Sequence, residues 1–242
     1  MADGVAIVTG GAAGIGGEIC RQMLAAGHEV FCLDRDAPEF TDPRLHAIRV
    51  DLLDEASTRA AAADIVATRQ VTHIVHNAGA IRPAVLADVQ TADLHALTQL
   101  HLAAPLLLAQ AALPTMRAQK FGRIVLISSR AALGLETRSA YAATKAGMIG
   151  LARTWAMELA PDGITVNVIA PGPIAGTRMF HDVVPTDSPR AEKLAAAIPV
   201  RRLGQPADIA RAVLFFADAN SDFITGQTLF VCGGSSLGSV AI

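Results

Sequence analysis

The sequence is poor in cysteine, aromatic residues and charge. Its cysteines, Cys20, Cys32 and Cys232, are odd in number and lack CxxC spacing. We therefore predict no disulfide framework and no metal site, and a reducing cytoplasm is the expected location. The chain carries 20 Lys and Arg against 22 Asp and Glu. This balance, without a long run of like charge, gives no reason to expect nucleic acid or an anionic membrane as a partner.

Long hydrophobic runs are also scarce. The chain has no basic segment before its first apolar residues, so it does not resemble a secretory signal. The one uncharged stretch long enough to span a bilayer, residues 95–116, contains His95, Gln99, His101, Gln110 and two prolines. Because polar groups are costly in hydrocarbon, we expect a helix buried between protein surfaces.

What is abundant is aliphatic sequence, since 52% of the 242 residues are hydrophobic and only 4% are aromatic. Such a chain is not disordered, and its length favours one large domain over residues 1–242. Short apolar, β-branched runs alternate with longer alanine-rich segments of helical spacing. The expected strands are 5–9, 30–34, 46–50, 72–76, 123–128, 165–169 and 228–231, and the expected helices are 14–26, 54–67, 91–118, 140–160 and 206–217.

This alternation predicts a single doubly wound α/β domain, with a parallel sheet of about seven strands and helices on both faces. Residues 171–199 break the pattern, because they hold several prolines and little sustained periodicity. A long irregular segment after an apolar strand is typical of a lid over a binding site. We expect this segment to contact the substrate.

A glycine-rich turn joins the first strand to the first helix. Glycines allow a tight turn and let the backbone approach a pyrophosphate, which the free N–H groups of the helix would bind. Such a turn alone is equally compatible with a simple structural turn. Its context favours a dinucleotide site, formed by Gly10, Ala13, Gly14, Ile15 and Gly16.

Asp34 ends the second strand eighteen positions after Gly16, near the offset of about 20 expected for an acidic ribose ligand. Its charge would repel a 2′-phosphate, so NAD is preferred over NADP. Arg35 is the counterargument, because it could turn toward a phosphate, although a solvated charge is the simpler interpretation. After the third strand, Asp51 with Leu52 is placed either to meet the adenine or to cap a helix.

Tyr141 and Lys145 are four residues apart in a predicted helix, so they share one face, and Ser129 ends the strand before it. A phenol needs help to act as a base near neutral pH, and a neighbouring ammonium favours the phenolate. Ser129 would hydrogen-bond the substrate oxygen while Tyr141 exchanges its proton, which leaves hydride transfer to the cofactor.

Taken together, these motifs resemble the short-chain dehydrogenase/reductase family along essentially the whole chain. The matching pieces, in order, are Thr9-Gly10 through Gly14-Ile15-Gly16, Asp34, Asp51-Leu52, Asn77-Ala78-Gly79, Ser128-Ser129, Tyr141-Ala-Ala-Thr-Lys145, Asn167, Pro171-Gly172, Arg202-Leu203-Gly204 and Gly226-Gln227 with Gly233-Gly234.

The resemblance implies a Rossmann-type domain in which Tyr141 is the acid/base, Ser129 orients the reacting group, and Lys145 binds the nicotinamide ribose and lowers the tyrosine pKa. It places Asn77, Ala78 and Gly79 along the cofactor and Pro171, Gly172 and Ile174 near the nicotinamide. It also implies subunit contacts through the long helices, and hence a homotetramer.

Two positions depart from the family pattern. Where the family usually has an Asn that holds a proton-relay water, this chain has His101, which could keep the relay, change its pH response or be an ordinary core histidine. Gly176 stands where a threonine is common, so contact with the carboxamide is expected from Thr177.

The substrate is less constrained. Arg138 lies three residues before Tyr141, and with Arg178 it could meet an anionic substrate, or both could be solvated charges. Phe180 and His181 are further candidate contacts. The leading hypothesis is an NAD-dependent oxidoreductase that interconverts a small secondary alcohol and its ketone. The alternatives are a 3-oxoacyl thioester reductase and a catalytically quiet NAD-binding sensor or scaffold.

Overall fold

One seven-stranded parallel sheet organises the chain. The computed structural model describes residues 4–181, 184–185 and 188–237. The strands lie in the order β3-β2-β1-β4-β5-β6-β7, which confirms the predicted doubly wound fold. Their bounds are Val5–Thr9 (β1), Glu29–Asp34 (β2), Leu45–Arg49 (β3), Val71–His76 (β4), Gly122–Ile127 (β5), Ile164–Pro171 (β6) and Thr228–Val231 (β7).

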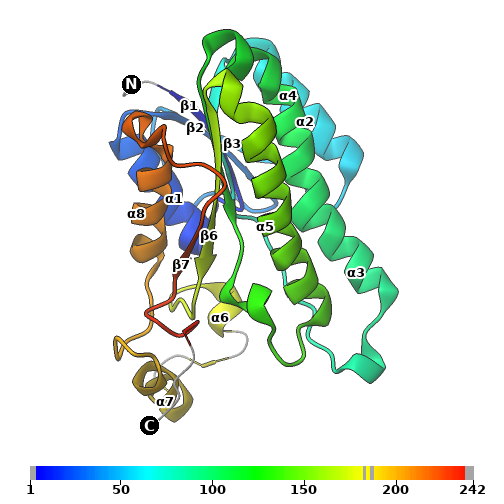
Figure 1. Ribbon diagram of the computed structural model, residues 1–242, viewed down its shortest axis with the longest axis vertical. Helices are drawn as coiled ribbons and strands as arrows, with labels where there is room; N and C mark the ends of the chain where they lie inside the picture. The colour runs from blue at the N-terminus through cyan, green and yellow to red at the C-terminus, as the bar shows by residue number, and fades with distance from the viewer. Residues whose placement is uncertain (1–3, 182–183, 186–187, 238–242) are drawn as a thin grey trace.

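Helices cover both faces of this sheet (Figure 1). One face carries α1 (Gly14–Ala25) and α8 (Pro206–Ala217), and the other carries α2 (Glu55–Thr68), α4 (Ala104–Gln119) and α5 (Ser139–Leu159). Short 3-10 turns connect the elements at Leu86–Asp88, Arg130–Leu133, Ala160–Asp162 and Ala219–Ser221.

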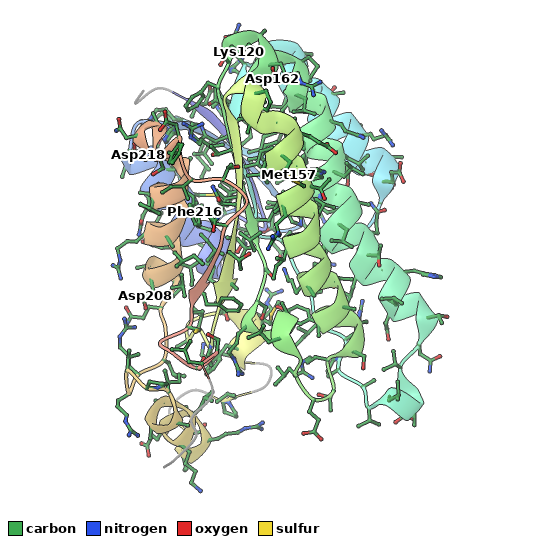
Figure 2. The ribbon with its side chains drawn as sticks, viewed as in Figure 1. Lys120, Met157, Asp162, Asp208, Phe216 and Asp218 are labelled. Atoms are coloured by element: carbon green, nitrogen blue, oxygen red, sulfur yellow. The ribbon has the colours of Figure 1, made fainter. Side chains whose placement is uncertain are left out.

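The strands are apolar throughout because the sheet has a hydrophobic core on each side. Successive side chains of a strand point to opposite faces. Ile74 and Ile124 accordingly belong to the core beneath α2, α4 and α5. Their neighbours Val75 and Val125 belong to the core beneath α1 and α8, which also contains Phe216 (Figure 2).

The long apolar helix expected at 91–118 is three segments. α3 (Thr91–Thr98) leads into a π-helical turn, Gln99–Ala103, and then into α4. The combined stretch Thr91–Gln119 has the length and composition of a membrane span, but half of its most apolar window is buried inside the protein. α4 packs against α2 and β4, as expected for a helix between protein surfaces.

The segment 171–199 is more regular than its prolines suggest, and its role as a substrate-binding lid stays a prediction. It contains α6 (Arg178–His181) and α7 (Pro189–Ala197). Ser188 caps α7 by accepting from the Ala191 N–H at 3.2 Å, and Pro189 fits the first helical position. Residues 182–183 and 186–187 of this segment lie outside the described residues.

Both helices of this segment lie at the end of the molecule where the strands terminate (Figure 1). At the opposite end, Lys120 Nζ and Asp162 Oδ1 form an ion pair at 2.7 Å (Figure 2). In parallel α/β sheets ligands bind beyond the carboxyl ends of the strands. The predicted site residues are therefore expected to converge at the carboxyl ends of the strands, near α6 and α7.

Candidate active site

The turn between β1 and α1 requires glycine at three positions. Gly10 and Gly14 have φ values of +64° and +56°, in the left-handed region. A Cβ on Gly16 would overlap the Gly10 carbonyl oxygen. These glycines bring α1 against the strand and keep the turn free of side chains.

The first turn of α1 has free backbone donors. Its N-cap is Ala13, which offers no side-chain hydrogen bond, and the turn contains no acidic residue. A helix N-terminus with unpaired N–H groups favours an anion such as a pyrophosphate. The glycine turn and this helix end thus fit a dinucleotide.

Asp34 lies beside the glycine turn. Its Oδ2 accepts from the Ala12 N–H at 3.0 Å and its Oδ1 accepts from the Arg35 N–H at 2.7 Å. The carboxylate is therefore fixed beside the glycine turn, where the sequence predicts the adenosine ribose. The Arg35 side chain is exposed.

An open groove beyond Asp34 is lined by Arg35, Val50 and Asp51, among other residues. The helix-capping alternative for Asp51 is wrong, because Asp54 caps α2 by accepting from the Ala56 and Ser57 N–H groups. Asp51 accepts instead from the Leu53 N–H at 3.0 Å. Leu52 is buried in the core. Asp51 remains free to face an adenine.

The residues after β4 are tied to the glycine turn. Thr9 Oγ1 accepts from the N–H groups of Asn77 and Ala78, each at 3.0 Å. Asn77 Nδ2 donates to the Gly10 carbonyl at 3.0 Å. The segment 77–80, which we call the cofactor loop, includes Gly79 and is thus held against the glycine turn.

Ser129 and Tyr141 meet at the end of β5. Ser129 lies close enough to the Tyr141 phenol to lower its pKa, and Ser129 Oγ accepts from the Ala131 N–H at 3.1 Å. Lys145, one turn further along α5, donates from Nζ to the Ile127 carbonyl at 2.7 Å. The structure thus brings the three predicted catalytic side chains together.

Burial dominates the proton affinities of this cluster. It raises the pKa of Tyr141, and the Ser129 hydrogen bond and the Arg138 charge only oppose this effect. Burial also lowers the pKa of Lys145 to about 7. The Lys145 Nζ faces the Ile127 carbonyl, and its predicted lowering of the tyrosine pKa stays a prediction.

His101 lies in the π-helical turn beside Lys145. Its Nε2 accepts from the Ala80 N–H at 3.3 Å, and its Nδ1 is 2.8 Å from Thr144 Oγ1. Burial, with the Lys145 charge, holds the pKa of this imidazole far below its usual range. Of the interpretations open from the sequence, a neutral and fully hydrogen-bonded histidine fits this geometry.

The predicted lid segment contacts the glycine turn at Thr177. Thr177 Cγ2 is 3.4 Å from the place a Cβ of Gly14 would occupy, so Thr177 is next to the predicted pyrophosphate position. Pro171 is buried and Gly172 passes close to the Cys232 backbone. Ile174 is buried in the core and pairs with Gly204.

The Arg178 side chain is largely exposed. Its guanidinium is 3.7 Å from Asp36 Oδ2, in the loop after β2, so it lies on the cofactor side of the lid. Phe180 and His181 are half-buried, with ring centres 5.7 Å apart. Arg138 caps α5, and its Nη1 donates to Thr137 Oγ1.

Sequence reasoning noted Thr144 and Thr9 only as parts of motifs and gave neither hydroxyl a role. Both hydroxyls act through bonds to distant residues, 43 and 67 positions away, so local spacing carries no signal for them. In the part of the chain that the structure describes, no three His, Cys, Asp or Glu side chains gather as a metal site.

The glycine turn, the open helix end and the Ser-Tyr-Lys cluster define a nicotinamide-dependent oxidoreductase with a Rossmann-type fold. Residues 10–236 match the family model described as Enoyl-(Acyl carrier protein) reductase. The chain belongs to the short-chain dehydrogenase/reductase family.

Several relatives act on acyl thioesters by name. The chain is 39% identical over 218 residues to a subunit of (2S)-[(R)-hydroxy(phenyl)methyl]succinyl-CoA dehydrogenase from Thauera aromatica, covering 89% of this chain and 84% of the relative. It is 35% identical to acetoacetyl-CoA reductase of Acinetobacter sp., covering 95% and 96%.

Two solved structures share this fold. One is aldohexose dehydrogenase of Thermoplasma acidophilum, with a TM-score of 0.91 and 26% identity, covering 99% of this chain and 96% of that one. The other is a candidate NAD(P)-dependent gluconate 5-dehydrogenase of Beutenbergia cavernae, solved with NADP at low occupancy, at 0.88 and 30% identity, covering 97% of both chains.

Proposed function

We propose that this enzyme interconverts a secondary alcohol and its ketone with NAD as the preferred cofactor, and that its substrate is a 3-hydroxyacyl or 3-oxoacyl thioester. The observation that carries the reaction type is the convergence of Ser129, whose side chain lowers the pKa of Tyr141, with Tyr141 and Lys145, whose Nζ is 5.7 Å from the tyrosine ring centre. Two hydroxyls that converge on one point can bind and protonate a single reacting oxygen.

The chain's own residues handle the proton. A bound nicotinamide supplies or accepts the hydride. Tyr141 gives its proton to the carbonyl oxygen in reduction and removes it from the hydroxyl in oxidation. Ser129 donates to the same oxygen and holds it in place. The Lys145 ammonium, when protonated, favours the phenolate form of Tyr141.

The thioester class is chosen over the small free alcohol that the sequence first favoured. Its support is the activity for which the relatives are named, since they include two CoA dehydrogenase subunits, an acetoacetyl-CoA reductase and several 3-oxoacyl-[acyl-carrier-protein] reductases. Sugar and polyol substrates are the second candidate, supported by the aldohexose and gluconate dehydrogenases among the structural neighbours. The intact Ser129, Tyr141 and Lys145 cluster argues against a quiet sensor.

NAD is preferred because Asp34 is held at the predicted ribose position with its charge near where a 2′-phosphate would lie. Arg35 and Arg178 are the nearby cations that would favour NADP. Asp36 already pairs with Arg178, which reduces the positive charge there.

Arg138 is the proposed contact for an anionic part of the substrate. Its charge lowers the pKa of Tyr141, which is consistent with a position near the reacting end, and it is in no ion pair among the described residues. Replacing it with Met should raise KM for a carboxylate-bearing acyl thioester more than for an uncharged one of equal length. Equal effects would remove this role. Phe180 and His181 remain proposed substrate contacts on the lid.

The proposed function is tested by nicotinamide absorbance with both cofactors against short 3-hydroxyacyl-CoA and 3-oxoacyl-CoA esters, aldonates and aldohexoses. The expected result is a kcat/KM at least about tenfold higher for an acyl-CoA pair with NAD(H), equal to about 1.4 kcal/mol of preference. Turnover of sugars alone would favour the second candidate. Bound NAD with no turnover would favour the sensor.

We also propose a homotetramer in a reducing cytoplasm, with a small-molecule substrate and neither nucleic acid nor membrane as a partner. The outer surfaces of α4 and α5 support the assembly, because Leu106 on α4 is 36% exposed and Met157 on α5 is 74% exposed. Figure 2 labels Met157 on α5. Light scattering should give four chains for the wild type and fewer for Met157→Lys. A monomeric wild type would contradict the assembly.

A further inference from the structure

His101 joins two parts of the site that no other described side chain links in this way. Its Nε2 accepts from the backbone N–H of Ala80, at the end of the cofactor loop. Its Nδ1 contacts Thr144 Oγ1, which lies on α5 between Tyr141 and Lys145. The ring is completely buried, so no water replaces either bond.

The bonds fix which nitrogen carries the proton. Nε2 accepts from an N–H, so the single proton of the neutral ring is on Nδ1, which donates to Thr144 Oγ1. The Thr144 hydroxyl proton is directed in turn to the Ala140 carbonyl at 3.0 Å. Protonating Nε2 would break the Ala80 bond and leave a buried N–H unpaired, which costs about 1 to 3 kcal/mol.

The groups that face the ring also oppose a second proton. They are Lys145 and Tyr141 from α5 and His76 from β4. Lys145 lies close by, since a Cβ on Gly79 would be 3.3 Å from His101 Nε2 and 3.5 Å from Lys145 Nζ. A cation on His101 would therefore be adjacent to the lysine ammonium.

A second buried histidine holds the other end of the cofactor loop. Thr9 Oγ1 accepts from two backbone N–H groups, so its hydroxyl proton is directed to His76 Nδ1 at 2.9 Å. Burial lowers the pKa of His76 to about 3. The loop is thus fixed to β1 at its start and to α5 at its end.

We propose that His101 is a positioning residue, a permanently neutral Nδ1–H imidazole that sets the cofactor loop at a fixed distance from Tyr141 and Lys145. It neither gains nor gives up a proton during turnover. This proposal rests on the proposed function for its kinetic consequences. The link itself is independent of the substrate.

The test compares His101→Phe, which keeps a ring but loses both bonds, with His101→Gln, whose amide can accept from Ala80 and donate to Thr144. His73→Phe is the matched control, because His73 is also buried and bonded at both nitrogens, to Thr72 Oγ1 at 2.8 Å and the Ala217 carbonyl at 3.2 Å, but lies at the start of β4. Both Phe variants should be less stable.

Only His101→Phe should weaken NAD binding and lower kcat/KM. The expected loss in kcat/KM is about 100-fold, the effect that a misplacement of one ångström can have. His101→Gln should recover most of this loss with an unchanged pH profile. If folded His101→Gln is as impaired as His101→Phe, or if His101→Phe binds NAD as well as His73→Phe does, the proposal is wrong.

Nitrogen-15 NMR of the histidine rings tests the tautomer without any substrate. The signal assigned to His101 by its loss in His101→Gln should keep the neutral Nδ1–H pattern between about pH 5 and 8, where an ordinary histidine titrates. Titration in that range would overturn the proposal even if the enzyme is active. Absence of turnover with an unchanging His101 signal would count against the proposed function alone.

Discussion

The Nζ atom of Lys145 lies 5.7 Å from the centre of the Tyr141 ring. The two groups are one turn apart on α5, and burial acts on them in opposite directions. It raises the pKa of the phenol and lowers that of the ammonium to about 7. Both changes favour the uncharged forms of the pair.

The rate of alcohol oxidation should therefore rise with pH. Oxidation needs Tyr141 without its proton, and because its pKa is raised, the unprotonated fraction increases with pH throughout the range above neutrality. The reverse reduction uses the protonated phenol and should be flat near pH 7. Initial rates in both directions across the pH range test this expectation. A fall in kcat/KM for oxidation between about pH 7 and 9 would contradict it.

Tyr141→Phe should lower kcat by about 100-fold to 10,000-fold, the usual contribution of a general acid or base. NAD affinity should change little, because the substitution removes only the hydroxyl. Titration calorimetry with NAD, run beside the kinetic assay, separates the two effects. Retained turnover would show that another group exchanges the proton.

Asp34→Asn should reduce the preference for NAD over NADP by about tenfold or more, which corresponds to about 1.4 kcal/mol. The amide oxygen can still accept from the Ala12 N–H, so the bond to the glycine turn is kept, while the charge and the acceptor for the Arg35 N–H are lost. Asp42→Asn is the control, since Asp42 also accepts a local backbone bond, from Arg44, but precedes β3. An unchanged cofactor ratio in Asp34→Asn would refute the ribose role.

Gly16→Ala should abolish NAD binding and destabilise the protein, because the new Cβ would overlap the Gly10 carbonyl. Gly17→Ala is the matched control on the same helix. A Cβ there would meet its nearest neighbour, the Ala12 carbonyl oxygen, at an ordinary 3.6 Å. We expect Gly17→Ala to gain about 0.5 to 1 kcal/mol from helix propensity. Thermal melts with and without NAD compare them, and equal behaviour would show that this packing is unimportant.

Local patterns made the strands and the glycine turn predictable from sequence. Val5–Thr9 and Thr228–Val231 form as predicted, since an apolar run bounded by turn residues leaves little choice. The π-helical turn at Gln99–Ala103 was not predictable, because one extra residue in a turn barely alters an apolar pattern.

Features that depend on distant contacts were the least predictable. His101 was singled out by family pattern, but its state depends on Ala80 and Thr144, which are 21 and 43 positions away. Arg178 was assigned to the substrate because it lies in the lid. Its partner, Asp36, comes from another strand end, and no spacing rule relates the two.

Because the start of α1 at Ala13 has no side-chain cap, a dinucleotide bound there would stabilise the folded chain as well as take part in the reaction. A ligand that binds only the folded state adds about 2.7 kcal/mol of stability at a concentration a hundredfold above its Kd. Depletion of the dinucleotide pool would bring this protein closer to unfolding and to proteolysis. Its abundance in the cell would then follow the supply of its own cofactor.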